Sequence, residues 1–196
     1  MIRAITKQLN YAGTALLNYG YDSSGLVEYK FNSSGFRSYN EYTSVPELVF
    51  AGGSISFGIG IAETDTYKHK VATFLNKSYW DLSYASEYYD NESIYNTLLE
   101  LSTIDKTACI VIQWVSDLRN AEHTATVYSY IQTINDIFSN CLHFYIDGKE
   151  TKKNLKSNYF DLINPVWLDS VANNTHPGTK THANLAKFII KKINEK

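Results

Sequence analysis

The chain of 196 residues has no marked excess of charge of either sign and no long hydrophobic run. Its 18 Lys and Arg residues stand against 20 Asp and Glu residues, which gives a formal net charge of -2 and a pI near 6.2. Nucleic-acid-binding proteins carry a basic excess, so we expect no nucleic-acid partner. No stretch approaches the roughly 18 consecutive apolar residues of a membrane-spanning helix, so we expect no membrane span.

Cysteine is scarce, and no secretory signal is visible at the start of the sequence. Cys109 and Cys141 are too few for a disulfide framework, and neither has the spacing of a metal site. Cys109 lies in the apolar run 108–112, which favours a buried thiol. Residues 1–8 contain no apolar core of a signal peptide, so the sequence predicts a cytoplasmic protein.

The composition is that of an ordinary globular protein, with 44% hydrophobic and 19% charged residues. The length suits one domain, and no linker divides it, so we expect a single domain over residues 1–196. Turn signals recur at 21–25 and 31–35, which indicates an irregular arm or hairpin over residues 1–45, packed on that domain. The 16 tyrosines fit either a sugar-binding groove or the rim of a core.

From residue 48 onward, short apolar runs alternate with segments of helical periodicity. Strands are predicted at residues 48–50, 79–82, 108–114 and 142–146. Helices are predicted at residues 67–75, 94–101, 124–139 and 183–193. This alternation predicts βαβ crossovers, and therefore a three-layer α/β/α sandwich with a mainly parallel central sheet. Active sites in such sheets lie outside the carboxyl ends of the strands.

The first candidate site follows the first predicted strand, where the chain reaches Ser54 through Gly52 and Gly53. A serine at such a turn can expose its hydroxyl. If a helix begins there, its free N–H groups favour an oxyanion beside the serine. The alternative is a glycine turn with a capping serine, and the segment alone fits both interpretations equally.

The second candidate is His176, which precedes Pro177 and Gly178 in a loop before the last predicted helix. A lone loop histidine is usually inert, but next to an exposed serine it becomes a candidate general base. His182 opens the last helix and is interpreted as a helix-start or packing residue.

The third candidate follows the most apolar strand and contains Ser116, Asp117 and Arg119. These side chains are predicted at the same edge of the sheet as the serine. They could donate hydrogen bonds in a site or form a network within their loop, and both interpretations stay open.

Taken together, these blocks resemble the SGNH (GDSL-type) hydrolase family, in the right order and over about residues 30–192. Residues 50–54 (Phe-Ala-Gly-Gly-Ser) resemble the serine block, with Gly53 at the usual aspartate. Residues 32–37 (Asn-Ser-Ser-Gly-Phe-Arg) resemble an N-x-x-G-F-R element of some members. Residues 80–86 fall at the family's N-L-x-x-x-G block, and residues 114–117 at its G-x-N-D block. Residues 173–178 match D-x-x-H-P-G, except that Asn173 replaces the aspartate.

The resemblance implies a two-step ester hydrolysis without a metal or organic cofactor. Ser54 would attack an acyl carbonyl, and His176 would take its proton and pass it to the leaving alcohol. The oxyanion would be held by the N–H groups of Ser54 and Ser86, with the Ser116 side chain as a further donor. Asn173 supplies no negative charge to the histidine, and Asp169 is the nearest acid upstream.

Two functions follow from these observations. The first is a serine esterase that cleaves small acyl esters, such as O-acetyl groups on carbohydrate, so its partner would be a small-molecule or glycan ester. The second is a catalytically weakened SGNH-fold domain that binds a glycan or another protein, which the departures at Gly53, Ser86, Ser116 and Asn173 favour. An Asn173 introduced to trap a complex would also explain the missing aspartate. The sequence does not indicate an oligomeric state.

Overall fold

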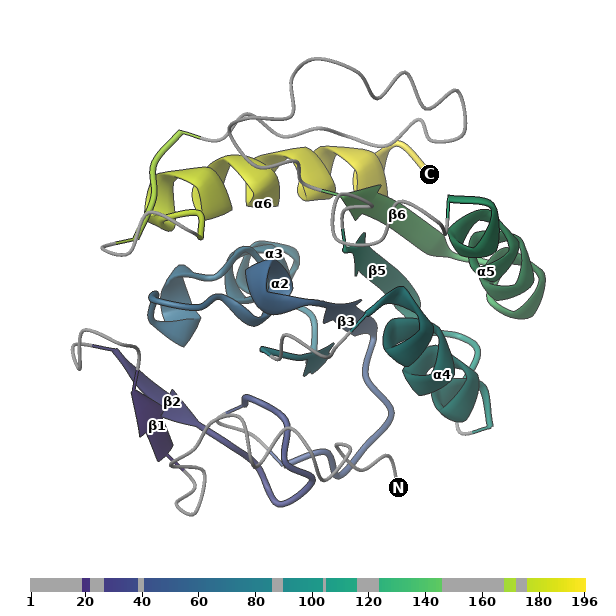
Figure 1. The fold of residues 1–196 in the computed structure, drawn as a ribbon, viewed down its shortest axis with the longest axis horizontal. Helices are drawn as coiled ribbons and strands as arrows, with labels where there is room; N and C mark the ends of the chain where they lie inside the picture. Colours follow the sequence, from purple (N-terminus) through teal and green to yellow (C-terminus); the bar gives the residue numbers. More distant parts are fainter. Residues whose placement is uncertain are drawn as a thin grey trace.

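A computed structural model describes residues 19–21, 27–38, 41–85, 90–103, 105–115, 124–145, 168–171 and 176–196. Two short strands come first, and strands then alternate with helices along the chain (Figure 1). The strands are β1 (Tyr19–Tyr21), β2 (Glu28–Lys30), β3 (Leu48–Gly52), β4 (Tyr79–Ser83), β5 (Cys109–Trp114) and β6 (Cys141–Tyr145). The helices are α2 (Ser54–Phe57), the 3₁₀ helix η1 (Glu63–Asp65), α3 (Tyr67–Leu75), α4 (Asn91–Ser102), α5 (Thr124–Ile137) and α6 (Thr179–Asn194).

The central sheet has the strand order β4-β3-β5-β6, and all of its neighbouring strands are parallel. Leu48 pairs with Tyr79 on one side and with Cys109 on the other, so β3 is an inner strand. The chain first moves from β3 outward to β4, and then crosses back over β3 to reach β5. The direction of winding therefore reverses between β3 and β5, and ligands of such folds bind at this reversal.

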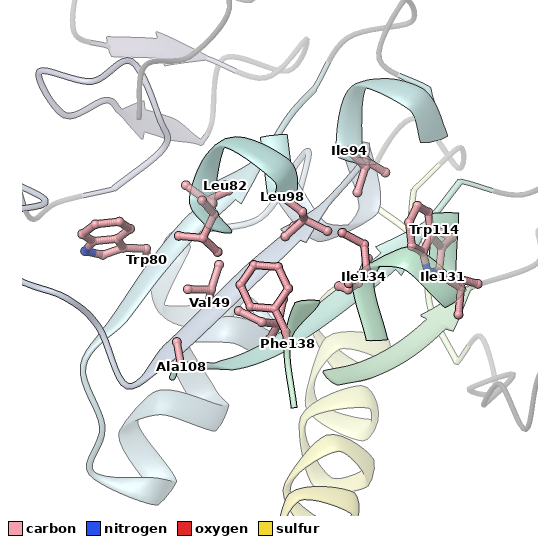
Figure 2. Packing of buried hydrophobic residues seen from close by; sticks show 14 of the residues in the cluster. Val49, Trp80, Leu82, Ile94, Leu98, Ala108, Trp114, Ile131, Ile134 and Phe138 are labelled. Atoms are coloured by element: carbon pink, nitrogen blue, oxygen red, sulfur yellow. The ribbon is translucent and has the colours of Figure 1, made fainter. Parts of the chain in front are cut away.

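Side chains of a strand point alternately to opposite faces of the sheet, so both faces of β3 are apolar. Two helices cover each face. On one face Val49 and Ala51 pack with residues of α4 and α5 and with Phe138, directly after α5. Figure 2 shows Ile94, Leu98, Ile134 and Phe138 in this cluster. On the other face, Leu48 and Phe50 pack with α3 and α6, whose contacting residues include Tyr67, Val71, Leu185 and Ile189. The predicted three-layer α/β/α sandwich with a mainly parallel sheet is confirmed.

The strands and helices predicted from residue 48 onward are all present, with small differences at their ends. The largest difference is at α6, which begins at Thr179, four residues before the predicted start. The N–H groups of Lys180 and Thr181 donate to the distant Asp169 carboxylate, at 2.9 Å and 2.8 Å. This carboxylate satisfies the first turn of the helix, a stabilisation that local periodicity does not reveal.

In the N-terminal part, β1 and β2 form an antiparallel pair. A tight loop follows, in which the Asn32 side chain accepts hydrogen bonds from the N–H groups of Ser34 and Phe36, at 3.1 Å and 3.0 Å. The predicted single domain with an arm over residues 1–45 stays a prediction. None of the helices in the described part of the chain has the length and apolar character needed to cross a bilayer.

Candidate functional site

The turn that carries Ser54 lies at the reversal point of the sheet. β3 ends at Gly52, and Ser54 is the first residue of α2, with its side chain partly exposed. A Cβ on Gly52 would come within 2.7 Å of the Ser56 Cβ and 2.8 Å of the Gln113 Cβ. A Cβ on Gly53 would lie 2.9 Å from the Val115 side chain. The expected tight glycine turn is confirmed, because only glycines allow α2 to lie this close to β5.

Gln113, near the carboxyl end of β5, joins that strand to the serine turn. Its side-chain oxygen accepts hydrogen bonds from the N–H groups of Gly53 and Ser56, at 3.1 Å and 3.2 Å. Its side-chain nitrogen donates to the Trp114 carbonyl at 2.6 Å. Gln113 is not among the site residues predicted from the sequence. The available signal was a glutamine inside an otherwise apolar strand that is buried along its whole length.

The Ser56 hydroxyl makes further hydrogen bonds that stabilise the serine turn, and its side chain is fully buried. The Ser83 hydroxyl, at the end of β4, donates to Ser56 Oγ at 2.7 Å. Ser56 Oγ also lies 2.5 Å from the Tyr67 hydroxyl, at the start of α3. Burial raises the pKa of Tyr67 well above its ordinary value, so this phenol stays protonated. The hydroxyl chain therefore ties α2 to β4 and α3.

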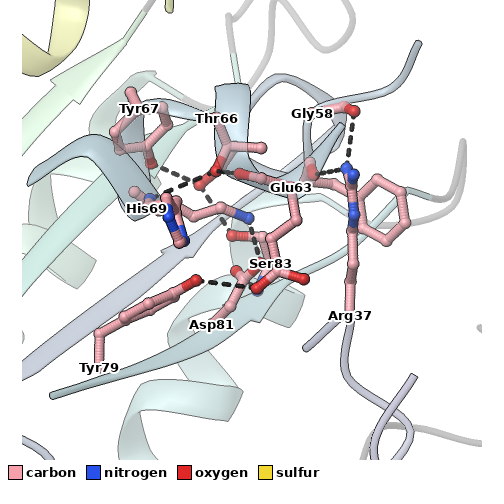
Figure 3. A network of polar contacts seen from close by, with 12 residues as sticks. Arg37, Gly58, Glu63, Thr66, Tyr67, His69, Tyr79, Asp81 and Ser83 are labelled. Atoms are coloured by element: carbon pink, nitrogen blue, oxygen red, sulfur yellow. Dashed lines mark hydrogen bonds and ion pairs between the residues drawn. The ribbon is translucent and has the colours of Figure 1, made fainter. Parts of the chain in front are cut away.

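Arg37 holds the other end of α2. Its guanidinium donates to the carbonyls of Phe57 at 2.6 Å, Gly58 at 2.7 Å and Ile61 at 2.7 Å. The guanidinium also lies over the Tyr29 ring, 4.5 Å from its centroid. A cation at the carbonyl end of a helix is favourable, and these carbonyls have few other donors. The loop that carries Arg37 therefore stabilises the serine turn. Figure 3 shows the Arg37 side chain reaching Gly58.

A group of buried charges lies beside this turn (Figure 3). Lys68 forms an ion pair with Asp81, and both side chains are almost completely buried. Glu63 accepts a hydrogen bond from the Tyr79 hydroxyl at 2.8 Å. Burial raises the pKa of Glu63 and lowers that of Lys68, although Asp81 opposes the second shift. With Arg37, the group contains two cationic and two acidic side chains, so its formal charges balance.

His176 lies in the segment just before α6 and is partly exposed. Its carbonyl accepts a hydrogen bond from the Val171 N–H at 3.1 Å. Val171 in turn lies against Gly60, where an added Cβ would come within 2.8 Å of the Val171 Cβ. Gly60 follows Ile59, whose N–H donates to the Ser54 carbonyl at 3.4 Å. The backbone of the His176 segment is therefore in contact with the loop that leaves the serine turn.

Asp169, the nearest acid before His176, binds the first turn of α6 through its carboxylate. Its carboxylate accepts from the N–H of Lys180 and from both the N–H and the hydroxyl of Thr181, at 2.8–2.9 Å. Partial burial raises the pKa of Asp169, but the hydrogen bonds from Lys180 and Thr181 outweigh that effect and leave it lowered. The carboxylate thus stabilises the start of the helix.

No family model matches the sequence, and no curated protein matches it. Among solved structures, a member of the lipolytic G-D-S-L protein family from Veillonella parvula superposes with a TM-score of 0.53 at 10% identity. That match covers 74% of this chain and 96% of the Veillonella chain. TesA superposes with a TM-score of 0.50 at 14% identity, over 72% of this chain and 94% of its own. The chain has the SGNH-hydrolase fold. The resemblance inferred from the sequence is confirmed at the level of the fold.

Several residues expected in the SGNH site lie outside the described part of the chain. They are Ser86, Ser116, Asp117, Arg119 and Asn173. Within the described part, no group of three or more His, Cys, Asp or Glu side chains is arranged to hold a metal ion.

His182 has the packing role that the sequence predicts. Its Nδ1 accepts a hydrogen bond from the Tyr67 N–H at 3.2 Å, and its ring stacks on that of Tyr67. Burial lowers the pKa of His182 to about 3, so the imidazole is neutral at physiological pH. His182 therefore joins α6 to α3 through Tyr67. The predicted burial of Cys109 is also confirmed.

Proposed function

We propose that this protein is a serine hydrolase of small acyl esters, with Ser54 as nucleophile and His176 as general base. The observation that carries the proposal is the position of Ser54, at the first residue of α2 and at the reversal point of an SGNH-type sheet. The contact between Val171 and Gly60 supports the pairing, because it joins the His176 segment to the serine loop.

In the proposed reaction, His176 takes the hydroxyl proton as Ser54 Oγ attacks the acyl carbonyl carbon. The tetrahedral intermediate collapses as the histidine returns that proton to the leaving alcohol, and an acyl-serine remains. Water then attacks the acyl group by the same proton transfers and regenerates the serine. No metal or organic cofactor takes part in these steps.

The oxyanion would be held by the N–H groups of Ser54 and Ser86 and by the Ser116 hydroxyl. In the first turn of α2, Gln113 already binds the N–H groups of Gly53 and Ser56. Within the described part of the chain, the N–H of Ser54 makes no hydrogen bond. It is therefore available to the oxyanion, and one such donor is typically worth about 10²–10³ in rate.

Asn173 would stand where the family has the carboxylate that orients the histidine. An asparagine can accept the ring N–H through its carbonyl oxygen, but it does not stabilise the imidazolium by charge. Since Asp169 caps α6, it does not replace this carboxylate in the conformation described. That observation favours a second candidate, a catalytically weakened SGNH-fold domain that binds a glycan or another protein.

For the substrate, we propose small acyl esters such as O-acetyl groups on carbohydrate. The lipolytic description of the Veillonella neighbour supports ester chemistry, and the 16 tyrosines are compatible with sugar binding.

The test is hydrolysis of 4-nitrophenyl acetate by the full chain and by three variants. Ser54→Ala and His176→Ala should each lower kcat by at least about 10³-fold, while Ser129→Ala, at an exposed serine of α5, should leave it unchanged. Equal rates for the full chain and Ser54→Ala would contradict the proposed esterase and favour the second candidate, the binding domain.

A further inference from the structure

We propose that Gln113 is a positioning residue for the serine turn. Its carboxamide oxygen holds the N–H groups of Gly53 and Ser56 toward the sheet and thereby leaves the Ser54 N–H directed to the reacting carbonyl. The inference rests on the proposed nucleophile, Ser54, and adds a residue that does not itself touch the substrate.

The orientation of the Gln113 carboxamide is fixed by its partners. The nitrogen faces the Trp114 carbonyl at 2.6 Å, which can only accept. The oxygen faces two N–H groups, which can only donate. A flipped carboxamide would lose all three interactions, so a single orientation is stable. With 2% of its surface exposed, the side chain has no water to replace them.

Packing alone does not explain a glutamine at this position in the sheet. Burying a carboxamide is unfavourable unless it is hydrogen-bonded, and the other residues of β5 are apolar or aromatic. A leucine or methionine would fill the same volume without that cost. The two hydrogen bonds to the serine turn offset this cost of burial. They connect Gln113 to residues 60 and 57 positions earlier in the sequence.

The two hydrogen bonds to Gln113 also determine which N–H groups of the turn stay available to a substrate. The first turn of a helix has N–H groups without partners inside the helix. Gln113 accepts from those of Gly53 and Ser56, which precede and follow Ser54 along the chain, and the Ser83 hydroxyl donates separately to the Ser56 hydroxyl. The backbone at Ser54 is thus fixed from both sides. An oxyanion donor works only if it is held in place before the reaction.

The experiment compares the full chain with Gln113→Met, which keeps the length of the side chain and removes the acceptor. Amide hydrogen exchange by NMR reports on the turn, and steady-state hydrolysis of 4-nitrophenyl acetate reports on the nucleophile. Thr97→Val is the matched control, because Thr97 is buried on α4 and donates within its own helix to the Ser93 carbonyl.

We expect Gln113→Met to speed exchange at Gly53 and Ser56 at least tenfold, with no change at Ile112. The kcat should fall by about tenfold to a hundredfold with KM within twofold, because misplacing a reacting group by about 1 Å costs about 10²-fold. Thr97→Val should change neither quantity. If Gln113→Met does not fold, Gln113→Glu keeps an acceptor for both N–H groups and adds a charge. It should keep exchange at Gly53 and Ser56 slow, because the acceptor is retained, and fast exchange there would overturn the inference.

Unchanged exchange at Gly53 and Ser56 in Gln113→Met would overturn the inference. Faster exchange with an unchanged kcat would overturn it too, since Gln113 would then stabilise the turn without positioning the nucleophile. Loss of the proposed function gives a different result, in which Ser54→Ala and the full chain hydrolyse the ester equally. The exchange rates alone then decide whether Gln113 holds the turn.

Discussion

Val171 lies against Gly60 so closely that a Cβ on the glycine would come within 2.8 Å of the valine Cβ. The valine N–H donates to the His176 carbonyl, and the glycine belongs to the loop that leaves Ser54. This contact joins the two segments that carry the proposed nucleophile, Ser54, and the proposed base, His176.

Gly60→Ala should therefore disturb the proposed active site. Gly60 has a φ of 79°, which disfavours alanine, and the added methyl group would collide with Val171. We expect kcat for 4-nitrophenyl acetate to fall at least about tenfold, because the His176 segment must move away. The double variant Gly60→Ala/Val171→Gly removes the Cβ and both methyl groups that collide and should recover part of the loss. If both variants keep the full kcat, the contact does not position His176.

Asn173→Asp should raise kcat by at least about tenfold, because a carboxylate would select the productive tautomer of His176 and stabilise its charged form. The matched comparison is Asp169→Asn, at the acid that caps α6. Both carboxylate oxygens accept hydrogen bonds, and an asparagine would turn an NH₂ group toward one of these donors. The variant should therefore lower the free energy of unfolding by about 1 kcal/mol, with little change in kcat. An Asn173→Asp protein that folds normally with an unchanged or lower kcat would show that residue 173 does not contact the histidine.

Arg37→Lys should lower the free energy of unfolding by about 2–4 kcal/mol, measured by urea denaturation. A lysine cannot donate in the fixed geometry that serves three carbonyls, and buried charge-assisted hydrogen bonds contribute about 1.5–3 kcal/mol each without adding fully. Lys77→Ala, which removes an exposed ion pair with Glu47, should change the free energy of unfolding much less, because water screens that pair. Equal losses for the two variants would contradict a structural role for Arg37 beneath α2.

Glu63→Gln should stabilise the protein increasingly as pH rises from about 4.5 toward neutrality. Burial raises the pKa of Glu63, so the folded chain binds this proton more tightly than the unfolded chain does. Stability from this group is present at low pH and is lost as pH rises through the raised pKa. The glutamine keeps an acceptor for the Tyr79 hydroxyl and has no proton to lose. Unfolding midpoints of both proteins across pH 4–8 test this, and a constant difference would refute it.

The sequence predicts the layers of this fold well, because apolar periodicity is a local property of the strands and helices. It also identifies the serine turn, since two glycines after a short apolar strand favour a close turn. It does not reveal the contacts that support that turn. The bonds from Gln113 to Gly53 and Ser56, and the cap from Asp169 to α6, connect residues far apart in sequence. The buried pair of Lys68 and Asp81 was missed for the same reason, since charged residues are normally predicted on the surface.

The central claim, that Ser54 is a nucleophile activated by His176, is tested most directly by covalent labelling with a fluorophosphonate probe. The labelled peptide of the full chain is identified by mass spectrometry and compared with Ser54→Ala and His176→Ala. We expect a single adduct on Ser54, no adduct in Ser54→Ala, and labelling of His176→Ala slowed by at least about 10²-fold. Labelling that persists in Ser54→Ala, or a folded full chain that is not labelled, would contradict it.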